Sequence, residues 1–238
     1  LMIRLPPRST PSNSSAASDV YKRQELACVP INSKEGQNYL KAMACAINYA
    51  FTNRQLITHW TREAFESVLR TSAEDLDMNI IYGVAHNIAK IEEHTIDGKK
   101  VKVCVHRKGA TRAFPPNHPA IPKKYKSIGQ PVLLPGSMGS ASYVLVGTPK
   151  SMELTFGSTA HGAGRNMSRA QAKRKFWGES VERQLLKEGT FVKSKSKVVL
   201  SEEAPQAYKN IDIVADVSDK VGIAKKVVRL VPIGVTKG

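Results

Sequence analysis

The sequence has 238 residues, of which 41% are hydrophobic and 6% aromatic, so it can bury a sizeable core and is not disordered throughout. Lys and Arg number 36 against 20 Asp and Glu, which gives a formal net charge of +16. Such an excess favours a phosphate-bearing partner, nucleic acid or nucleotide, although a basic surface that serves only solubility is the alternative.

The sequence gives no support for membrane insertion or secretion. No run approaches the roughly 18–20 apolar residues that a membrane helix needs, and the N-terminus lacks the apolar stretch of a signal peptide. Cys28, Cys45 and Cys104 are an odd number without C-x-x-C spacing, which favours reduced thiols. We therefore expect a soluble, cytoplasmic protein without a membrane partner.

Residues 1–24 differ from the rest of the chain. They contain five serines and three prolines, show no apolar periodicity and begin with leucine. The string SSAASDVYKRQ also resembles translated sequencing-adapter sequence. We predict that 1–24 is a non-native or disordered leader, a sequencing artefact, and that the folded region is 25–238.

The first part of the folded region has a helical pattern. Apolar residues between 40 and 51 recur at the spacing of one helical face. Thr61 is placed to cap a second helix, and Thr71 with Glu74 has the spacing of a capping box for a third. We expect three helices before residue 88.

Alternating residues then indicate strands. Residues 88–96 and 101–107 flank Asp97-Gly98, a strong hairpin signal. Further short strands bordered by glycine or proline are expected at 131–134, 143–147 and 152–156.

The C-terminal third mixes both patterns. A long helix is expected from Ser168 to about Lys187, and strands near 196–200 and 226–235 flank shorter helices around 202–222. Strands and helices do not alternate as regular β-α-β units. The sequence therefore predicts an α+β fold, with mixed β-sheets and surrounding helices.

Two glycine-rich stretches are the candidates for chemistry. The stretch 135–142 (PGSMGSAS) offers small side chains and backbone N–H groups to a polyanion, or it is an ordinary tight turn. The stretch 157–165 (GSTAHGAGR) surrounds His161 with small residues. A neutral imidazole is a competent nucleophile toward phosphorus, and the glycines after it allow backbone donors to hold the developing charge. A loop histidine without function remains the alternative.

Arg165, Arg169 and Lys173 are spaced four apart and predict a basic stripe at the start of the following helix, suited to a chain of phosphates. Read from the residues alone, a solvated helix face explains the stripe equally well. His86, at a strand junction, is more often a structural residue than a metal ligand.

Six segments carry a family resemblance: RQLITHWTRE (54–63), HNIAK (86–90), HRKGATRAFPP (106–116), GQPVLLPGSMGSASYVL (129–145), FGSTAHGAGRNMSR (156–169) and EEAPQAYKNI (202–211). With the terminal VTKG, they resemble the C-terminal half of the RtcB family of RNA-splicing ligases, and the archaeal branch above all. The resemblance runs in unbroken order from about residue 24 to the end, so we expect an RtcB-like fold, truncated at its N-terminus.

The resemblance implies a GTP-dependent, manganese-dependent RNA ligase with two Mn²⁺ ions per intact site. Such an enzyme joins a 2′,3′-cyclic phosphate or 3′-phosphate end to a 5′-hydroxyl end through a covalent histidine-GMP intermediate. The expected substrates are tRNA halves in splicing or broken RNA ends in repair. Archease is a possible activating partner.

The resemblance also assigns roles to residues. His161 is the catalytic nucleophile, His86 a metal ligand that also borders the nucleotide, and Arg165 and Arg169 RNA contacts. The nucleotide-binding set comprises His86, Asn87, Pro135, Gly136, Ser137, Met138, Ser142, His161, Gly162, Ala163, Gly164, Tyr208 and Lys237. Lys237 rests on the resemblance alone.

The upstream metal-ligand motifs of the family are absent from these 238 residues, so we expect the chain to be inactive by itself. Two other readings remain. One is a non-catalytic basic RNA-binding module, which predicts no covalent adduct. The other is a phosphotransfer enzyme that carries a bare phosphate on His161 in place of GMP.

Overall fold

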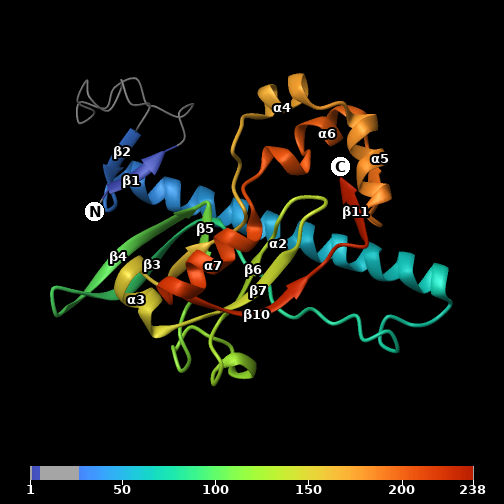
Figure 1. Ribbon diagram of the computed structural model, residues 1–238. Helices are drawn as coiled ribbons and strands as arrows, with labels where there is room; N and C mark the ends of the chain where they lie inside the picture. Colours follow the sequence, from blue (N-terminus) through green and yellow to red (C-terminus); the bar gives the residue numbers. More distant parts are fainter. Residues whose placement is uncertain (1, 6–26, 238) are drawn as a thin grey trace. The chain divides into compact units, whose positions relative to one another are not determined.

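A computed structural model describes residues 2–5 and 27–237 (Figure 1). The chain divides into two compact units. The first comprises Leu1–Gly83 and Ile88–His106, and the second comprises Val84–Asn87 and Arg107–Gly238. In the described ranges, helices accompany several small sheets, most of them antiparallel, which confirms the predicted α+β class.

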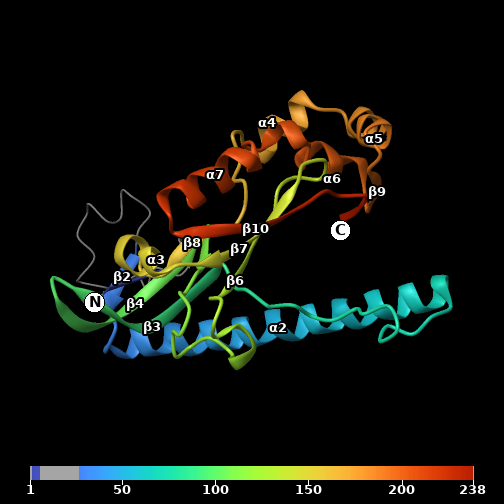
Figure 2. The same cartoon turned by 60° about the horizontal axis from the view of Figure 1, so that its bottom comes forward.

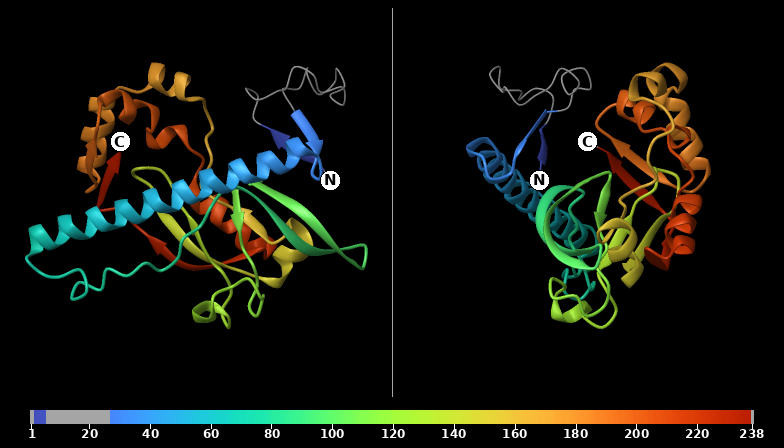
Figure 3. Two further views of the ribbon diagram at one scale, coloured as in Figure 1. Left: turned by 180° about the vertical axis from the view of Figure 1, so that it is seen from behind. Right: turned by 90° about the vertical axis from the view of Figure 1, so that its left-hand side faces the viewer.

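The first unit is built on one long helix, α2 (Lys34–Leu69). Ser33 caps it by accepting a bond from the Gly36 N–H, and Arg70 ends it in the left-handed conformation at φ 53°. The left view of Figure 3 shows it as a single uninterrupted rod. The prediction of a second helix starting at Thr61 is therefore wrong. The Thr61 hydroxyl donates to the Ile57 carbonyl, four residues earlier, at 2.7 Å, which is the hydrogen bond typical of a threonine inside a helix.

The predicted helix at Thr71 is also wrong, because residues 73–77 form turns and no helix begins there. Ser72 and Asp75 make only the first bond of a capping box, one position later; the second bond joins their two side chains and leaves out the Ser72 backbone N–H. The Asp75 N–H donates to the Ser72 hydroxyl (3.1 Å), which donates to the Asp75 carboxylate (2.7 Å). These bonds close a turn and no helix follows.

The hairpin is confirmed as β3 (Asn87–Ile96) and β4 (Lys99–Lys108). Asp97 and Gly98 both have positive φ, 49° and 76°, as the two-residue turn requires. A second pair joins β1 (Met2–Leu5) to β2 (Ala27–Pro30) in antiparallel register. Apart from β1, the predicted leader 1–24 lies outside the described residues and remains a prediction.

The core of the second unit is an antiparallel sheet in the order β10-β7-β6. These strands are β6 (Pro131–Leu134), β7 (Ser142–Gly147) and β10 (Ala224–Leu230). Helix α7 (Ile211–Val221) lies along β10 (Figure 2). Its Ile211 and Ala215 pack against Leu134 and Leu145 in the main apolar cluster. The strand predictions for 131–134 and 143–147 are confirmed.

A short antiparallel pair, β5 (Ala110–Arg112) with β8 (Ser158–Ala160), stands beside this sheet. The strand predicted at 152–156 is wrong, because Pro149 opens helix α3 (Pro149–Thr155). Phe156 ends that helix at φ 50°, and β8 follows two residues later. None of the helices in the described part of the chain has the length and apolarity that a membrane crossing demands.

The predicted helix 168–187 is two helices, α4 (Arg169–Lys175) and α5 (Gly178–Lys187). Phe176 and Trp177 are extended between them. A Cβ on Gly178 would lie 2.1 Å from the Lys197 carbonyl oxygen, so the start of α5 packs directly on another segment. The apolar periodicity of residues 168–187 does not show this contact between distant residues, so it does not predict the break between the two helices.

The strand predicted near 196–200 is displaced. Ser196 caps helix α6 (Lys197–Glu202), and the strand is β9 (Phe191–Ser194). A short 3-10 helix, η3 (Pro205–Ala207), follows α6. The predicted strand 226–235 is interrupted at Pro232 and continues as β11 (Gly234–Lys237), which pairs in parallel with β9.

Candidate active site

His161 directly follows strand β8, at the edge of the short β5-β8 pair. Ala160 pairs with Ala110, which brings Gly109 beside the imidazole. A Cβ on Gly109, whose φ is +74°, would lie 3.9 Å from the His161 Nε2. The imidazole is half-buried and has small neighbours on both sides.

His86 and His161 lie together although 75 positions separate them in the sequence. Their rings stack with centroids 4.4 Å apart and planes 3° from parallel. The Thr111 hydroxyl donates to the Ala85 carbonyl at 3.3 Å and holds the segment before β3 against β5. Asn87 is exposed at the start of β3.

The surroundings of His161 favour its neutral form. Burial lowers its pKa most, and the charges of His86 and Lys108 lower it further. A neutral imidazole keeps a lone pair on one ring nitrogen, which a nucleophile toward phosphorus needs. The site is therefore suited to attack by His161 near neutral pH.

The two glycine-rich stretches are neighbours in the structure. The Ala163 N–H donates to the Pro135 carbonyl at 3.1 Å, and a Cβ on Gly162 would lie 3.3 Å from the same oxygen. A Cβ on Gly136 would lie 2.0 Å from the Ala141 carbonyl oxygen, so only glycine fits there. Stretch 135–142 thus forms one wall beside the histidine.

Serine hydroxyls occupy backbone donors in this wall. The Gly136 N–H donates to the Ser142 hydroxyl at 3.2 Å, and the Ser137 N–H donates to the Ser140 hydroxyl at 2.6 Å. Met138 as a whole residue is 2% exposed, and its side chain packs in the apolar cluster with Leu185. In this arrangement Met138 offers a ligand almost no surface.

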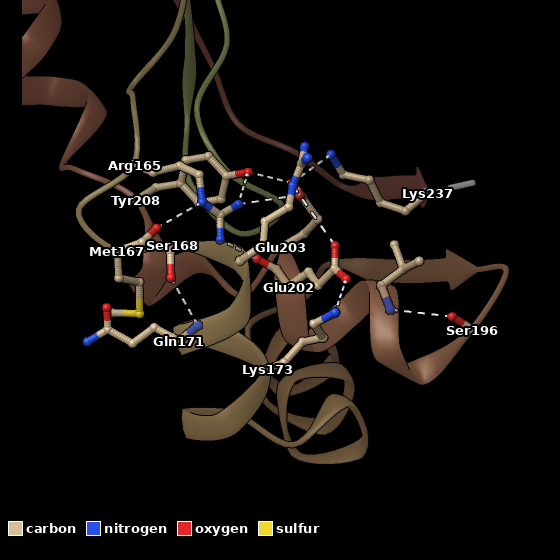
Figure 4. A network of polar contacts seen from close by, with 12 residues as sticks. Arg165, Met167, Ser168, Gln171, Lys173, Ser196, Glu202, Glu203, Tyr208 and Lys237 are labelled. Atoms are coloured by element: carbon tan, nitrogen blue, oxygen red, sulfur yellow. Dashed lines mark hydrogen bonds and ion pairs between the residues drawn. The ribbon is translucent and has the colours of Figure 1, made fainter. Parts of the chain in front are cut away.

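A second group of predicted residues gathers around an acidic residue, Glu203, that the sequence did not single out (Figure 4). The Arg165 Nη1 donates to the Tyr208 hydroxyl (2.9 Å) and lies 3.4 Å from a Glu203 oxygen. The Tyr208 hydroxyl donates to Glu203. The Lys237 Nζ lies 3.6 Å from Glu203 and the Arg169 Nε lies 3.7 Å from it.

The predicted basic stripe is thus paired with acids. Lys173 contacts Glu202 at 3.0 Å, and Arg169 contacts both glutamates. The Arg165 side chain is 23% exposed, and its three nitrogens donate to neighbouring groups, including the Met167 and Glu202 carbonyls. Arg169, 70% exposed, is the arginine that remains accessible to a ligand.

A pocket of about 390 Å³ lies between stretch 135–142 and the start of α7. Ser137 and Ser140 line one side, and Tyr208 lines another. Asp212 and Arg229 also line it, joined at 2.9 Å, and the Tyr143 hydroxyl donates to Asp212 at 2.6 Å. These three residues carry no motif spacing, and sequence reasoning missed them.

Within residues 2–5 and 27–237, no three His, Cys, Asp or Glu side chains are grouped so as to hold a metal ion. His86 stacks on the His161 imidazole and belongs to no such group among the residues that the structure describes. The described residues therefore do not fit a complete manganese site.

Comparison with known proteins gives one family. The family model described as tRNA-splicing ligase RtcB matches residues 10–238. A protein of that name from Methanocaldococcus jannaschii is 61% identical over 215 residues, which is 90% of this chain and 22% of the relative. The relatives from Methanococcus maripaludis and Archaeoglobus fulgidus are 60% and 58% identical over 90% of this chain and 45% of their own length. The chain spans less than half of each of these relatives, and across its matched length it belongs to the RtcB family.

Proposed function

We propose that this chain is the nucleotide-transferring part of a GTP-dependent RNA ligase. The ligase would join a 2′,3′-cyclic phosphate or 3′-phosphate end to a 5′-hydroxyl end. The observation that carries the proposal is His161, a half-buried imidazole whose lowered pKa keeps it neutral, held beside two glycine-rich stretches. Membership of the RtcB family supports it.

The proposed chemistry proceeds in three displacements. A His161 ring nitrogen attacks the α-phosphorus of GTP, a P–N bond forms, and pyrophosphate leaves as the P–O bond to the β-phosphate breaks. An oxygen of the RNA 3′-phosphate then attacks the same phosphorus and breaks the P–N bond. Finally the 5′-hydroxyl attacks the activated 3′-phosphate, GMP leaves, and the phosphodiester is closed. A cyclic phosphate must first be opened by water.

The chain's residues take distinct parts in this scheme. Backbone groups of Gly162, Ala163 and Gly164, together with stretch 135–142, border the phosphates. Tyr208 and Lys237 border the guanine. Arg169 is the RNA contact, whereas Arg165 holds its neighbours in place through the contacts described above.

Manganese belongs to the proposal only as a cofactor of a longer polypeptide. His86 is the donor that this chain would contribute, and further ligands would have to come from sequence beyond it. Substrates such as tRNA halves or broken RNA ends, archease as a partner and a cytoplasmic location rest on family membership alone.

The test is covalent labelling of an extended chain, defined as residues 25–238 preceded by the upstream part of the Methanococcus maripaludis relative. With Mn²⁺ and α-labelled GTP we expect an acid-labile label on His161, and His161→Ala should remove both label and ligation. His59→Ala is the matched control, because His59 is an exposed histidine of α2 that pairs only locally with Glu63. Labelling that survives His161→Ala contradicts the assignment.

The same experiment separates the two other readings. A phosphotransfer enzyme would take label from γ-labelled and not α-labelled GTP. A non-catalytic RNA-binding module would take neither. The pairing of Arg165, Arg169 and Lys173 with Glu202 and Glu203 argues against the module, because much of the stripe's charge is already neutralised.

A further inference from the structure

We propose that Glu203 is a positioning residue for nucleotide recognition, whose single carboxylate holds Tyr208, Lys237 and Arg165 in one arrangement. The inference rests on the proposed function, which puts Tyr208 and Lys237 beside the guanine. It adds to that function a residue that would not itself touch the nucleotide.

Glu203 joins four separate segments. It directly follows α6, whereas Tyr208 follows η3, Lys237 lies in β11 and Arg165 lies in the loop after β8 (Figure 4). One carboxylate oxygen accepts from the Tyr208 hydroxyl and lies 3.6 Å from the Lys237 Nζ. The other lies 3.4 Å from the Arg165 Nη1. The glutamate side chain is 16% exposed, so water competes little for these contacts.

The contacts decide what Tyr208 can offer a ligand. Its hydroxyl has one proton, which is donated to Glu203, and it accepts from Arg165. The hydroxyl therefore has no donor left for a nucleotide while Glu203 is ionised. What remains is the ring, which also carries the Arg165 guanidinium 4.7 Å from its centroid. Tyr208 is thus positioned to meet a base by ring contact.

Lys237 depends on Glu203 in a different way. A lysine side chain has four rotatable bonds, and this one is 37% exposed near the end of the chain. Its backbone is fixed by β11, whose Lys237 pairs with Ser194 of β9. Among its described contacts, the ion pair with Glu203 orients the ammonium group.

The Glu203 carboxylate must be ionised to hold Tyr208 and the cations in place, and its surroundings keep it ionised. Burial alone would raise its pKa, but the Tyr208 hydrogen bond and the charges of Lys237, Arg165 and Arg169 together lower the pKa below the ordinary value. Without the carboxylate, three cations would face one another across a half-buried site. They would separate and take Tyr208 out of its present orientation.

The neighbouring Glu202 supplies a matched control. Its carboxylate pairs with Lys173 at 3.0 Å and Arg169 at 4.0 Å, on the outer side of the network. It reaches Arg165 only through its backbone carbonyl, at 2.6 Å, which a substitution preserves. Glu202→Gln and Glu203→Gln therefore remove the same charge one residue apart, and only the second disturbs Tyr208 and Lys237.

The first measurement is GMP binding to the purified 238-residue chain by calorimetry, with AMP as the comparison. Glu203→Gln should weaken GMP binding by about tenfold or more, as expected for the loss of a charged hydrogen bond. Glu202→Gln should change it by less than about twofold, the usual effect of an exposed ion pair. Glu203→Asp keeps the charge and should recover part of the affinity.

The second measurement needs no ligand. Burial raises the pKa of the Tyr208 phenol most, and the hydrogen bond and charge of Glu203 raise it further, against an opposing effect of Arg165. In an ultraviolet titration, taken as the difference from Tyr208→Phe, Glu203→Gln should move this transition to lower pH, and Glu202→Gln should leave it in place.

The outcomes are distinct. If neither the unaltered 238-residue chain nor the extended chain binds GMP, the proposed nucleotide site fails and this inference with it. If either chain binds GMP, and Glu203→Gln in that chain matches Glu202→Gln in both affinity and Tyr208 titration, this inference alone is overturned.

Discussion

Replacement of Gly136 by alanine tests whether stretch 135–142 holds the shape on which His161 depends. The added Cβ would lie 2.0 Å from the Ala141 carbonyl oxygen and 2.4 Å from the Ser140 hydroxyl oxygen. Both distances are far inside van der Waals contact. The serine can rotate away, but the carbonyl belongs to the backbone, so the loop itself must open.

The expected loss of stability is about 1–3 kcal/mol, the usual cost of overpacking. For a chain of this size, each kcal/mol lowers Tm by about 2–4 °C, so the melting temperature should fall by roughly 2–12 °C. The disturbance also passes to the nucleophile, because the Pro135 carbonyl holds the Ala163 N–H at 3.1 Å, two residues beyond His161. Labelling by α-labelled GTP should fall together with stability.

Thermal unfolding by circular dichroism and GMP labelling of the extended chain measure the two effects. Gly189→Ala is the control, since Gly189 has φ +82° with nothing within 4 Å of a built Cβ, between α5 and β9. Its left-handed backbone makes alanine cost about 1–2 kcal/mol, without moving stretch 135–142. The reasoning is refuted if Gly136→Ala has the same Tm as the unaltered protein and is labelled with GMP as fast as Gly189→Ala.

Further expectations concern hydrogen bonding, acidity, salt and completeness. Tyr143→Phe should lower the free energy of unfolding in urea by about 0.5–1.5 kcal/mol, because its bond to Asp212 is lost; an unchanged midpoint would contradict this. Hydrogen bonds from Arg229 and Tyr143 lower the pKa of Asp212, and the pKa of Glu203 is lowered as well. The stabilisation that these two ionised carboxylates give the folded protein is therefore present above the ordinary carboxyl pKa of about 4, and it is lost as the pH falls below that value. Tm should therefore drop below about pH 4, and a rise there would be the contrary result. The logarithm of the RNA association constant should fall linearly with the logarithm of the salt concentration, with a slope of about −0.7 for each phosphate that the protein neutralises. Arg169→Ala should make this slope less steep, and an equal slope in both proteins would show that Arg169 does not contact the RNA. The 238-residue chain alone should not ligate RNA in a gel assay with Mn²⁺ and GTP, whereas the extended chain should; ligation by the short chain would show that its own residues suffice for the metal.

Local signals in the sequence were sufficient for several elements. The hairpin around Asp97-Gly98 follows from turn chemistry, because both residues adopt the positive φ that their types tolerate. Strand β6 is bounded at its start by Pro131 and ends before the proline of stretch 135–142. In these places the local preference and the tertiary structure agree.

Elements that depend on distant contacts were wrong or displaced. The break between α4 and α5 is fixed where Gly178 meets the Lys197 carbonyl, nineteen positions away, and no periodicity shows it. Thr61 has the residue type of a cap, but no proline or glycine between 37 and 69 stops the helix that contains it. A capping residue type is a weaker signal than the absence of a breaker.

In the candidate site too, the sequence predicts individual residues but not the contacts that depend on the tertiary structure. The glycines around His161 pointed to the nucleophile, but its stacking on His86 depends on the β5-β8 pairing and could not be read from the residues alone. Glu203 lies in the segment 202–211 that carries the resemblance, but the sequence predicts no role for it, since an acidic pair in a basic chain has many surface explanations. Its importance appears only when Arg165, Tyr208 and Lys237 are seen to converge on it.

The placement of Lys237 has a practical consequence for anyone who expresses this protein. The penultimate residue is locked into β11, and its carbonyl accepts from the Lys195 N–H at 2.9 Å. An affinity tag or fluorescent protein fused after residue 238 would begin two positions beyond the proposed guanine contact. Purification handles are therefore better attached at the other end of the polypeptide, and C-terminal trimming by carboxypeptidases during preparation would remove the lysine before any assay begins.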